Sequence, residues 1–422
     1  MRRLNAVCAL YVLLLAASAC VRGGLAPVEF GGRFVAADGP PVEVRAIVQA
    51  EHRRDAPRYL RAAIQSLTTL TPWLGAFPHA ALTIVDPPWH AGAAAEPSAV
   101  VLARTPWWSS STALAPELAA ARGLARRSWS EAVDTGALPP WFVDGLVEYS
   151  ARRVVIPMFQ GDNLEPGYAM FEQRYFGGLV PRFVRIRLLP EADGDPLPAY
   201  RASPRADVAA SSSPADRRSL AAKTVLTLDT LERWVGQPVF DGVLAEFARS
   251  VRTGRPTIDD FARVASAATG QDLSWLFAQT LGGSAVLDYA IAELTSVPGP
   301  AGGFDTTVVA ARLGDGAFTG SSAPRVGPFE SGRGLTVLVT FADGERVAEH
   351  WDGRDARQTF GYRGPSRAVS ATIDPNRSLL LDVNRTNNSR MVTSTSGAAA
   401  TRWAARWMMW LEHALLTYSL FA

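Results

Sequence analysis

The chain has 422 residues, of which 48% are hydrophobic and 19% charged, and its formal net charge is +2. This composition is that of a globular protein and excludes a chain that is disordered as a whole. The nearly neutral charge argues against nucleic acid as a partner, because phosphate binding needs a clear excess of basic side chains. The length leaves room for two or three domains, each with its own core.

The N-terminal residues have the order of a secretory signal peptide. Arg2 and Arg3 precede a short apolar run and four small residues. Cys20 follows directly, and Ala17-Ser18-Ala19-Cys20 resembles the box at which bacterial lipoproteins are lipidated. Lipidation of Cys20 and simple cleavage both remain open. Residues 1–20 therefore predict an extracytoplasmic protein, either in the bacterial periplasm or anchored to a membrane as a lipoprotein.

The only cysteines are Cys8 and Cys20, both at the N-terminal end. After removal of the signal peptide, the chain can form no internal disulfide and no thiolate metal site. We therefore expect its stability to come from packing alone.

Residues 26–110 are predicted to form a small α/β segment. Asp55 to Leu70 carries apolar residues at helical spacing. Four short stretches rich in β-forming residues predict strands, at 33–36, 42–48, 81–85 and 98–103.

Residues 111–297 are predicted to be mostly helical. Thr257 and Asp260 resemble a capping box, and Gly270 can end the helix that follows them. Residues 192–216 are rich in Pro, Ser, Asp and Ala and show weak periodicity, which predicts a long surface loop.

The remaining chain changes character after the Pro- and Gly-rich stretch at 298–303. Alternation with period two predicts a β-sandwich over residues 303–395. Residues 400–422 predict an amphipathic or apolar C-terminal helix. Glu412 and His413 in its middle favour a helix lying in the membrane interface or docked on the protein over a membrane span. The predicted fold class is α+β.

Two segments resemble the zinc site of the gluzincin aminopeptidases, the family of the alanyl aminopeptidases. There, the first segment reads H-E-x-x-H and the second carries the third zinc ligand as W-x-x-E-G. Here the chain reads Ala121-Arg122-Gly123-Leu124-Ala125 and then Trp141-Phe142-Val143-Asp144-Gly145. Eighteen residues separate Ala125 from Asp144, which is the family's spacing. Glu148 and Tyr149 also match residues near that ligand.

A second block continues the resemblance. Residues 221–236 are similar to the family's Y-E-K-G-A-L run and its following helix, with Lys223 on the Lys and Gly236 on the Gly. This register puts Ala221 where the transition-state-stabilising Tyr belongs. The resemblance covers residues 40–395 and implies a thermolysin-like catalytic domain, a helical aminopeptidase-type region and an Ig-like β-domain. The family's large N-terminal β-domain has no room here.

The chemistry of that site is missing from this sequence. A catalytic zinc needs three protein ligands and a water, and the water needs a general base. The resemblance puts Ala121 and Ala125 on the His ligands, Arg122 on the base, Asp144 on the third ligand and Ala221 on the oxyanion donor. The five histidines contain no pair at metal-ligand spacing. We therefore expect no zinc cofactor and no hydrolysis by the family's mechanism.

The same register suggests residues of a retained cleft. One hypothesis pairs the Arg122 guanidinium with the Asp144 carboxylate in place of the metal's charge. The alternative is that Arg122 is an exposed helix residue beside Arg126 and Arg127. The predicted cleft-binding side chains are Glu96, Trp107, Trp108, Arg122 and Asp144.

Two functions from different classes follow. The first is a catalytically inactive, aminopeptidase-like extracytoplasmic protein that binds a peptide or protein, or scaffolds a membrane-associated assembly. Its contact with the membrane would come from a lipid on Cys20, the C-terminal helix, or both. The second is an active metalloaminopeptidase or another hydrolase that uses residues not recognised from the sequence. Whether the protein is an enzyme therefore stays open.

Overall fold

The protein has a mixed α+β fold, in which an N-terminal α/β region with helices is followed by antiparallel sheets. It divides into two compact units, one of Met1–Asp195 with Asp241–Val264 and one of Pro196–Phe240 with Ala265–Ala422. The computed structural model describes residues 27–36, 39–87, 99–105, 115–158, 195–206, 213–300, 302–319, 334–393 and 396–419.

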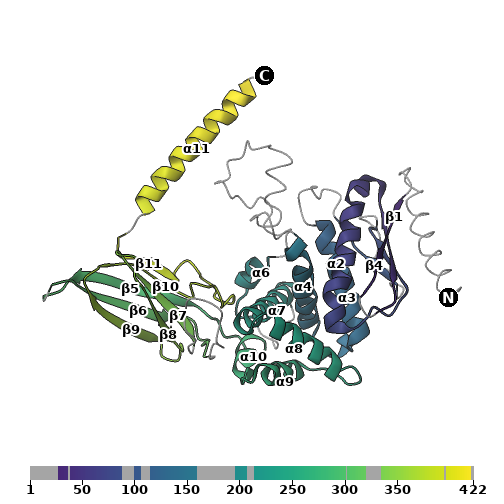
Figure 1. Ribbon diagram of the computed structural model, residues 1–422, viewed down its shortest axis with the longest axis horizontal. Helices are drawn as coiled ribbons and strands as arrows, with labels where there is room; N and C mark the ends of the chain where they lie inside the picture. The colour runs from purple at the N-terminus through teal and green to yellow at the C-terminus, as the bar shows by residue number, and fades with distance from the viewer. Residues whose placement is uncertain are drawn as a thin grey trace. The chain divides into compact units, whose positions relative to one another are not determined.

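The first unit contains a four-stranded sheet in the order β1-β2-β3-β4 (Figure 1). Its strands are β1 (Val28–Phe34), β2 (Val42–Val48), β3 (Ala81–Val85) and β4 (Val100–Leu102). β1 runs antiparallel to β2, whereas β2, β3 and β4 are parallel to one another. The carboxyl ends of these three strands therefore meet at one edge of the sheet.

Helices cover this sheet because their apolar residues repeat every three or four positions. α2 contacts β1 and β2, and α3 contacts β4. Tyr59, Leu67 and Leu124 are among the residues that close the core between the layers. The helices of the first unit are η1 (Ala50–Asp55), α2 (Ala56–Leu74), α3 (Ala115–Ala132), η2 (Thr135–Ala137) and α4 (Pro140–Met158). Two more helices belong to it in part, namely α8 (Gln237–Ser250) from Asp241 onward and α9 (Ile258–Thr269) up to Val264.

The predicted boundaries of α9 are confirmed. The backbone N–H of Asp260 donates to the Thr257 hydroxyl at 3.1 Å, and the backbone N–H of Thr257 donates to the Asp260 carboxylate at 3.1 Å. This is a reciprocal capping box. Gly270, with φ of 65°, ends the helix in the left-handed conformation that glycine adopts without strain.

The second unit begins with α6 (Leu197–Ala202), α7 (Pro214–Val235) and α10 (Ser274–Thr280). The prediction of one long surface loop at 192–216 was wrong for residues 197–202, which form α6. The Tyr200 side chain is buried there, and its hydroxyl donates to the Leu381 carbonyl at 3.1 Å. Long-range packing of one aromatic residue thus overrode the weak local pattern.

Two antiparallel sheets follow in the second unit, ordered β11-β10-β7-β8 and β5-β6-β9. β5 begins well before the predicted boundary near residue 298. A β-bulge between Ile291 and Glu293 interrupts its alternation, which hid the period of two. The strands are β5 (Tyr289–Pro298), β6 (Phe304–Arg312), β7 (Leu335–Phe341), β8 (Arg346–Trp351), β9 (Arg357–Gly364), β10 (Ala368–Ile373) and β11 (Ser389–Met391).

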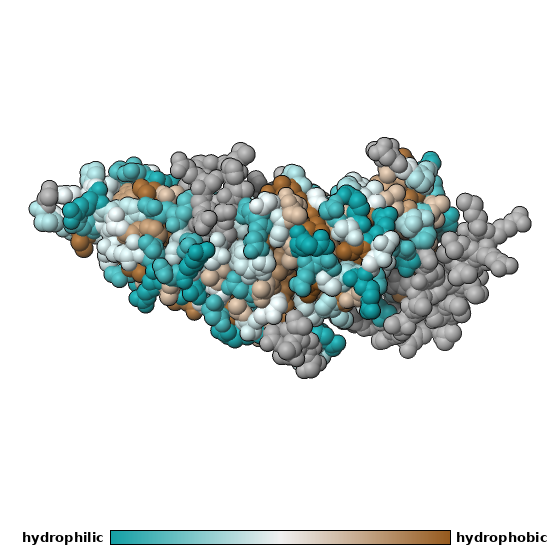
Figure 2. Space-filling model, turned by 90° about the horizontal axis from the view of Figure 1, so that it is seen from below, coloured by the Kyte–Doolittle hydropathy of each residue, from teal (hydrophilic) through white to brown (hydrophobic). Residues whose placement is uncertain are grey.

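The last element is the 24-residue helix α11 (Ser396–Ser419). Large apolar side chains on it are 47–66% exposed, namely Trp403, Met408, Met409, Leu411 and Leu415. Among the helices that the structure describes, none is long and apolar enough to cross a membrane. Elsewhere, apolar and hydrophilic residues intermingle over the face of the molecule drawn in Figure 2, as is usual for protein surfaces.

Candidate functional site

The two segments that resemble a zinc site lie on α3 and α4, which pack against each other. Ala121 is completely buried in a cluster with Leu118, Ala151, Val154 and Val155, so its methyl group faces α4. Ala125, one turn later, is also completely buried. Both alanines are therefore core residues of the helix pair.

Gly123 holds α3 close to the sheet. A Cβ at this position would lie 2.4 Å from the Val101 side chain and 3.3 Å from the Leu102 carbonyl oxygen of β4. A glycine costs about 1 kcal/mol in a helix relative to alanine, so close packing explains its presence in mid-helix. α3 is thus fixed by β4 on one side and by α4 on the other.

Charged side chains join α3 to α4 at the surface of this packed core. Arg122 Nε donates to Glu148 Oε2 at 2.5 Å and Arg122 Nη2 to Glu148 Oε1 at 2.8 Å, a bidentate pair. Burial lowers the pKa of Arg122 and the hydrogen bond with Glu148 raises it, with a net rise. The predicted pair of Arg122 with Asp144 was wrong, because Arg126 Nη2 donates to Asp144 at 2.6 Å instead.

The residues at this place do not fit a catalytic zinc ion. Two methyl groups and a guanidinium stand where the resemblance requires two imidazoles and a carboxylate, and none of these three can ligate a cation. Asp144 has about half of its side chain exposed and is paired with Arg126. The described residues contain no cluster of three His, Cys, Asp or Glu side chains that could hold a metal.

The other predicted site residues fall in two groups. Ala221 lies half-buried on α7 in the second unit, near Lys223, whose Nζ donates to the Gly283 carbonyl at 3.1 Å. Ala221 has only a methyl side chain, so it offers no oxyanion donor. Glu96, Trp107, Trp108 and Cys20 lie outside the residues that the structure describes.

A second polar cluster, which the sequence did not reveal, lies at the carboxyl ends of β2 and β3. His52 Nδ1 and Asp86 Oδ2 are 2.6 Å apart, and the Asp86 side chain is fully buried. Gln49 Nε2 donates to the Asp86 carbonyl at 3.0 Å. Tyr59 shares a hydrogen bond with Thr105, which follows β4. The carboxyl edge of parallel strands is a common place for binding sites.

The electrostatics of this cluster favour a charged histidine. The hydrogen bond to Asp86 raises the pKa of His52, and the opposing effect of burial is smaller. Burial, reinforced by the nearby Asp86 charge, raises the pKa of Tyr59. His52 Nε2 and Asp86 Oδ1 are buried without a hydrogen-bond partner among the described residues. A histidine oriented by a carboxylate can act as a general acid or base.

The sequence contained one usable signal for this pair. Asp86 follows β3 directly and stands before two prolines, a position where a parallel strand ends. His52 is 34 residues earlier, so only the parallel pairing of β2 with β3 brings the two side chains together.

No protein-family model matches the chain, and no curated protein matches it in sequence. Among solved structures, it is similar to the crystal structure of Legionella pneumophila aminopeptidase A in complex with aspartic acid, with a TM-score of 0.49 and 12% sequence identity. The match covers 84% of this chain and 38% of the aminopeptidase, so the chain spans well under half of that protein's length. A likeness of this degree does not assign the chain to a family.

Proposed function

We propose that the protein is a catalytically inactive, aminopeptidase-like extracytoplasmic protein that binds a peptide or protein or scaffolds a membrane-associated assembly. The observation that carries this proposal is the Arg122–Glu148 pair beside the buried Ala121 and Ala125. An ion pair and apolar packing hold α3 to α4 where an active enzyme of this family would place a metal and its base. The scaffold can then serve recognition without hydrolysis.

The proposal includes the finer architecture implied by the sequence. The first unit and the helices of the second correspond to a thermolysin-like peptidase region over residues 26–297. The two sheets, which include β5 ahead of the predicted residues 303–395, correspond to an Ig-like β-sandwich. Seven strands in two antiparallel sheets, with alternating burial along β7, support this part of the proposal.

Membrane association is proposed through Cys20, α11 or both. The exposed apolar side chains of α11 support a helix that lies at a membrane surface, because the apolar side chains named above would otherwise face water. Residues 400–422 are the predicted contact, and a lipid on Cys20 would add a second anchor. Two such anchors are the usual requirement for stable binding.

The proposed lack of aminopeptidase activity is tested by measuring the zinc content of the protein and its turnover of aminoacyl substrates. The purified chain is expected to hold no stoichiometric zinc and to leave aminoacyl reporter substrates uncleaved, with or without added metal. Stoichiometric zinc with chelator-sensitive turnover would overturn the proposal.

Restoring the site tests the register itself. The variant combines Ala121→His, Arg122→Glu, Ala125→His and Asp144→Glu. The two imidazoles must fit positions that are completely buried, so a lower melting temperature is expected. Zinc binding by the folded variant supports the register, whereas a folded variant without metal binding counts against it.

The second candidate function is a hydrolase that uses residues outside the zinc frame. The buried His52–Asp86 pair, with His52 Nε2 lacking a described partner, favours it. A panel of ester, amide and phosphoester reporters would be assayed with the wild type and with His52→Gln. Turnover that disappears in His52→Gln, while the variant stays folded, would establish this alternative.

A further inference from the structure

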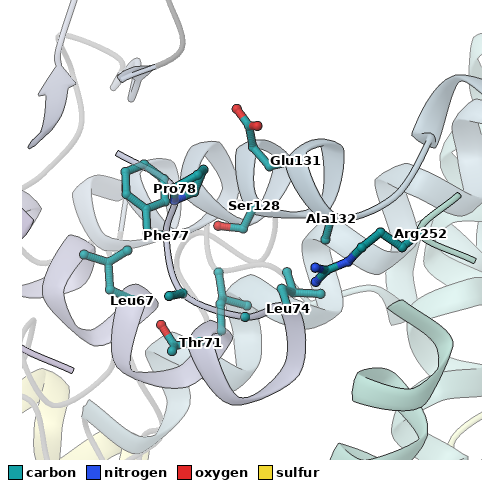
Figure 3. Close-up of a pocket in the computed structure, with 12 residues that line it drawn as sticks. Leu67, Thr71, Leu74, Phe77, Pro78, Ser128, Glu131, Ala132 and Arg252 are labelled. Carbon is teal, nitrogen blue, oxygen red and sulfur yellow. The ribbon is translucent and has the colours of Figure 1, made fainter. Parts of the chain in front are cut away.

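A pocket of about 200 Å³ opens in the first unit between the carboxyl ends of α2 and α3 and the turn after α8 (Figure 3). Its apolar part is formed by Leu67, Leu70, Leu74 and Phe77. Gly75, with φ of 90°, ends α2 at the pocket and turns the chain around it. The pocket is separate from the Arg122–Glu148 pair, which does not line it.

The size of the pocket limits what it can hold. An apolar cavity of about 150 Å³ is known to accept a benzene molecule. A volume of about 200 Å³ therefore suits a six-membered ring or a branched aliphatic group with a few further atoms. Burying such a group gains about 25 cal/mol per Å² of apolar surface.

One end of the pocket carries a cationic side chain, Arg252. In Figure 3 the Arg252 guanidinium points toward Leu74 and Ala132. A Cβ on Gly75 would lie 3.6 Å from Arg252 Nη2, so the guanidinium lies directly beside the backbone of this turn. Arg252 has no hydrogen bond or ion pair with any residue that the structure describes.

The one acidic side chain of the lining does not compete for this cation. Arg127 Nη2 contacts Glu131 Oε1 at 2.7 Å, and His79 Nε2 lies 3.5 Å from the same oxygen. In Figure 3 the Glu131 carboxylate points away from the pocket, whereas the Ser128 hydroxyl points into it. The lining thus presents an apolar wall, the hydroxyls of Ser128 and Thr71, and the Arg252 guanidinium, which has no partner among the described residues.

We propose that this pocket binds a carboxylate attached to a compact apolar group, with the apolar group among the α2 leucines and the carboxylate on Arg252. Two sources share this chemistry, a free aromatic or aliphatic acid and the C-terminal residue of a peptide. Arg forms bidentate hydrogen bonds with carboxylates, and the Ser128 hydroxyl can donate a further one. The inference stands whether or not the chain has lost peptidase activity.

Binding of phenylacetate to the full chain tests the proposal, measured by ligand-observed NMR and calorimetry. We expect one site, and we expect phenylacetamide, which has the same shape without the charge, to bind about tenfold more weakly. Arg252→Gln is expected to weaken phenylacetate binding by about the same factor. Equal binding of the acid and the amide would overturn the charge assignment.

The matched control is Arg255→Gln in the same turn. Arg255 is exposed and does not line the pocket, so its loss should leave binding unchanged. Equal weakening by Arg252→Gln and Arg255→Gln would show a nonspecific charge effect and contradict the proposal. Ser128→Leu, which fills the pocket from α3, is expected to abolish binding of both compounds.

A peptide ending in Gly-Gly-Phe with a free carboxyl group distinguishes the two sources. Tighter binding of this peptide than of phenylacetate, lost on C-terminal amidation, supports a peptide end as the ligand. Tighter binding of phenylacetate supports a free acid. Binding of neither compound to the wild type at millimolar concentration would overturn the site. Arg252→Gln is a surface change, so its folding can be checked independently of binding.

Discussion

Two polar clusters in the first unit differ in how their charges are held. The Arg122–Glu148 pair between α3 and α4 has side chains 39% and 22% exposed, and all of its carboxylate oxygens are used. The His52–Asp86 pair at the ends of β2 and β3 is 13% and 0% exposed and has one buried polar atom without a described partner on each residue. The first cluster is an ion pair that links α3 to α4. The second has buried polar atoms that could exchange a proton with a ligand.

The difference shows where function is best sought in this protein. Polar groups that are fully paired and partly hydrated contribute modestly to stability and leave nothing for a ligand. Buried polar atoms without partners are costly and persist in proteins for a reason. Among the described residues, both carboxylate oxygens of Glu148 are paired, whereas one buried polar atom of His52 and one of Asp86 have no partner.

The same substitution at a buried and at an exposed carboxylate should give the largest contrast. Asp86→Asn removes the charge from a buried carboxylate that accepts a hydrogen bond from His52. We expect a loss of about 2 kcal/mol in the free energy of unfolding, measured with urea. Asp144→Asn at the exposed Arg126 pair should cost no more than about 0.5 kcal/mol. Similar losses for both variants would contradict the larger contribution given to the buried His52–Asp86 pair.

The close approach of α3 to β4 should be nearly as sensitive. Gly123→Ala places a Cβ 2.4 Å from the Val101 side chain, and we expect a net loss of about 1.5 kcal/mol. Gly242→Ala is the matched control, because it lies in α8 with no atom within 4 Å of the new Cβ. The control should be stabilised by about 0.5–1 kcal/mol through helix propensity. A stabilised Gly123→Ala variant would show that α3 is not held tightly against the sheet.

The Arg122–Glu148 ion pair between α3 and α4 should contribute less to the free energy of unfolding. Arg122→Gln breaks a bidentate pair that is partly exposed, and we expect a loss of about 1 kcal/mol in the free energy of unfolding. Arg126→Gln, which breaks a single contact at a more exposed site, is the control and should be almost neutral. The two variants would be compared by thermal and urea unfolding. Equal effects would contradict the special role given to Arg122.

The smallest expected effect is a pH dependence at the second cluster. The pKa of His52 is raised in the folded protein above its ordinary value of about 6.5. Its charged form therefore contributes stability that is fully present below pH of about 6.5 and is lost as the pH rises through the folded pKa. The stability difference between wild type and His52→Gln should shrink between pH 5.5 and pH 8.5. A constant difference would mean that the pair is not charged.

Much of the fold was predictable from local patterns. The strand at 42–48, the strand at 81–85 and the capped helix after Thr257 lie where the sequence puts them. Strand β1 spans 28–34 rather than the predicted 33–36, because Gly31 and Gly32 are poor strand formers and pairing with β2 sets its ends. The finer assignment to an aminopeptidase-type domain and an Ig-like domain stays a prediction.

By itself, the sequence determined the α+β class. It also determined that Ala121, Arg122 and Ala125 cannot bind a metal, because an alanine methyl or a guanidinium has no lone pair for a metal in any fold. Only the tertiary structure decided which charges meet. Arg122 and Glu148 are 26 residues apart, and His52 and Asp86 are 34 apart. Such pairs depend on helix packing and strand register, which are set by the whole core rather than by any local pattern.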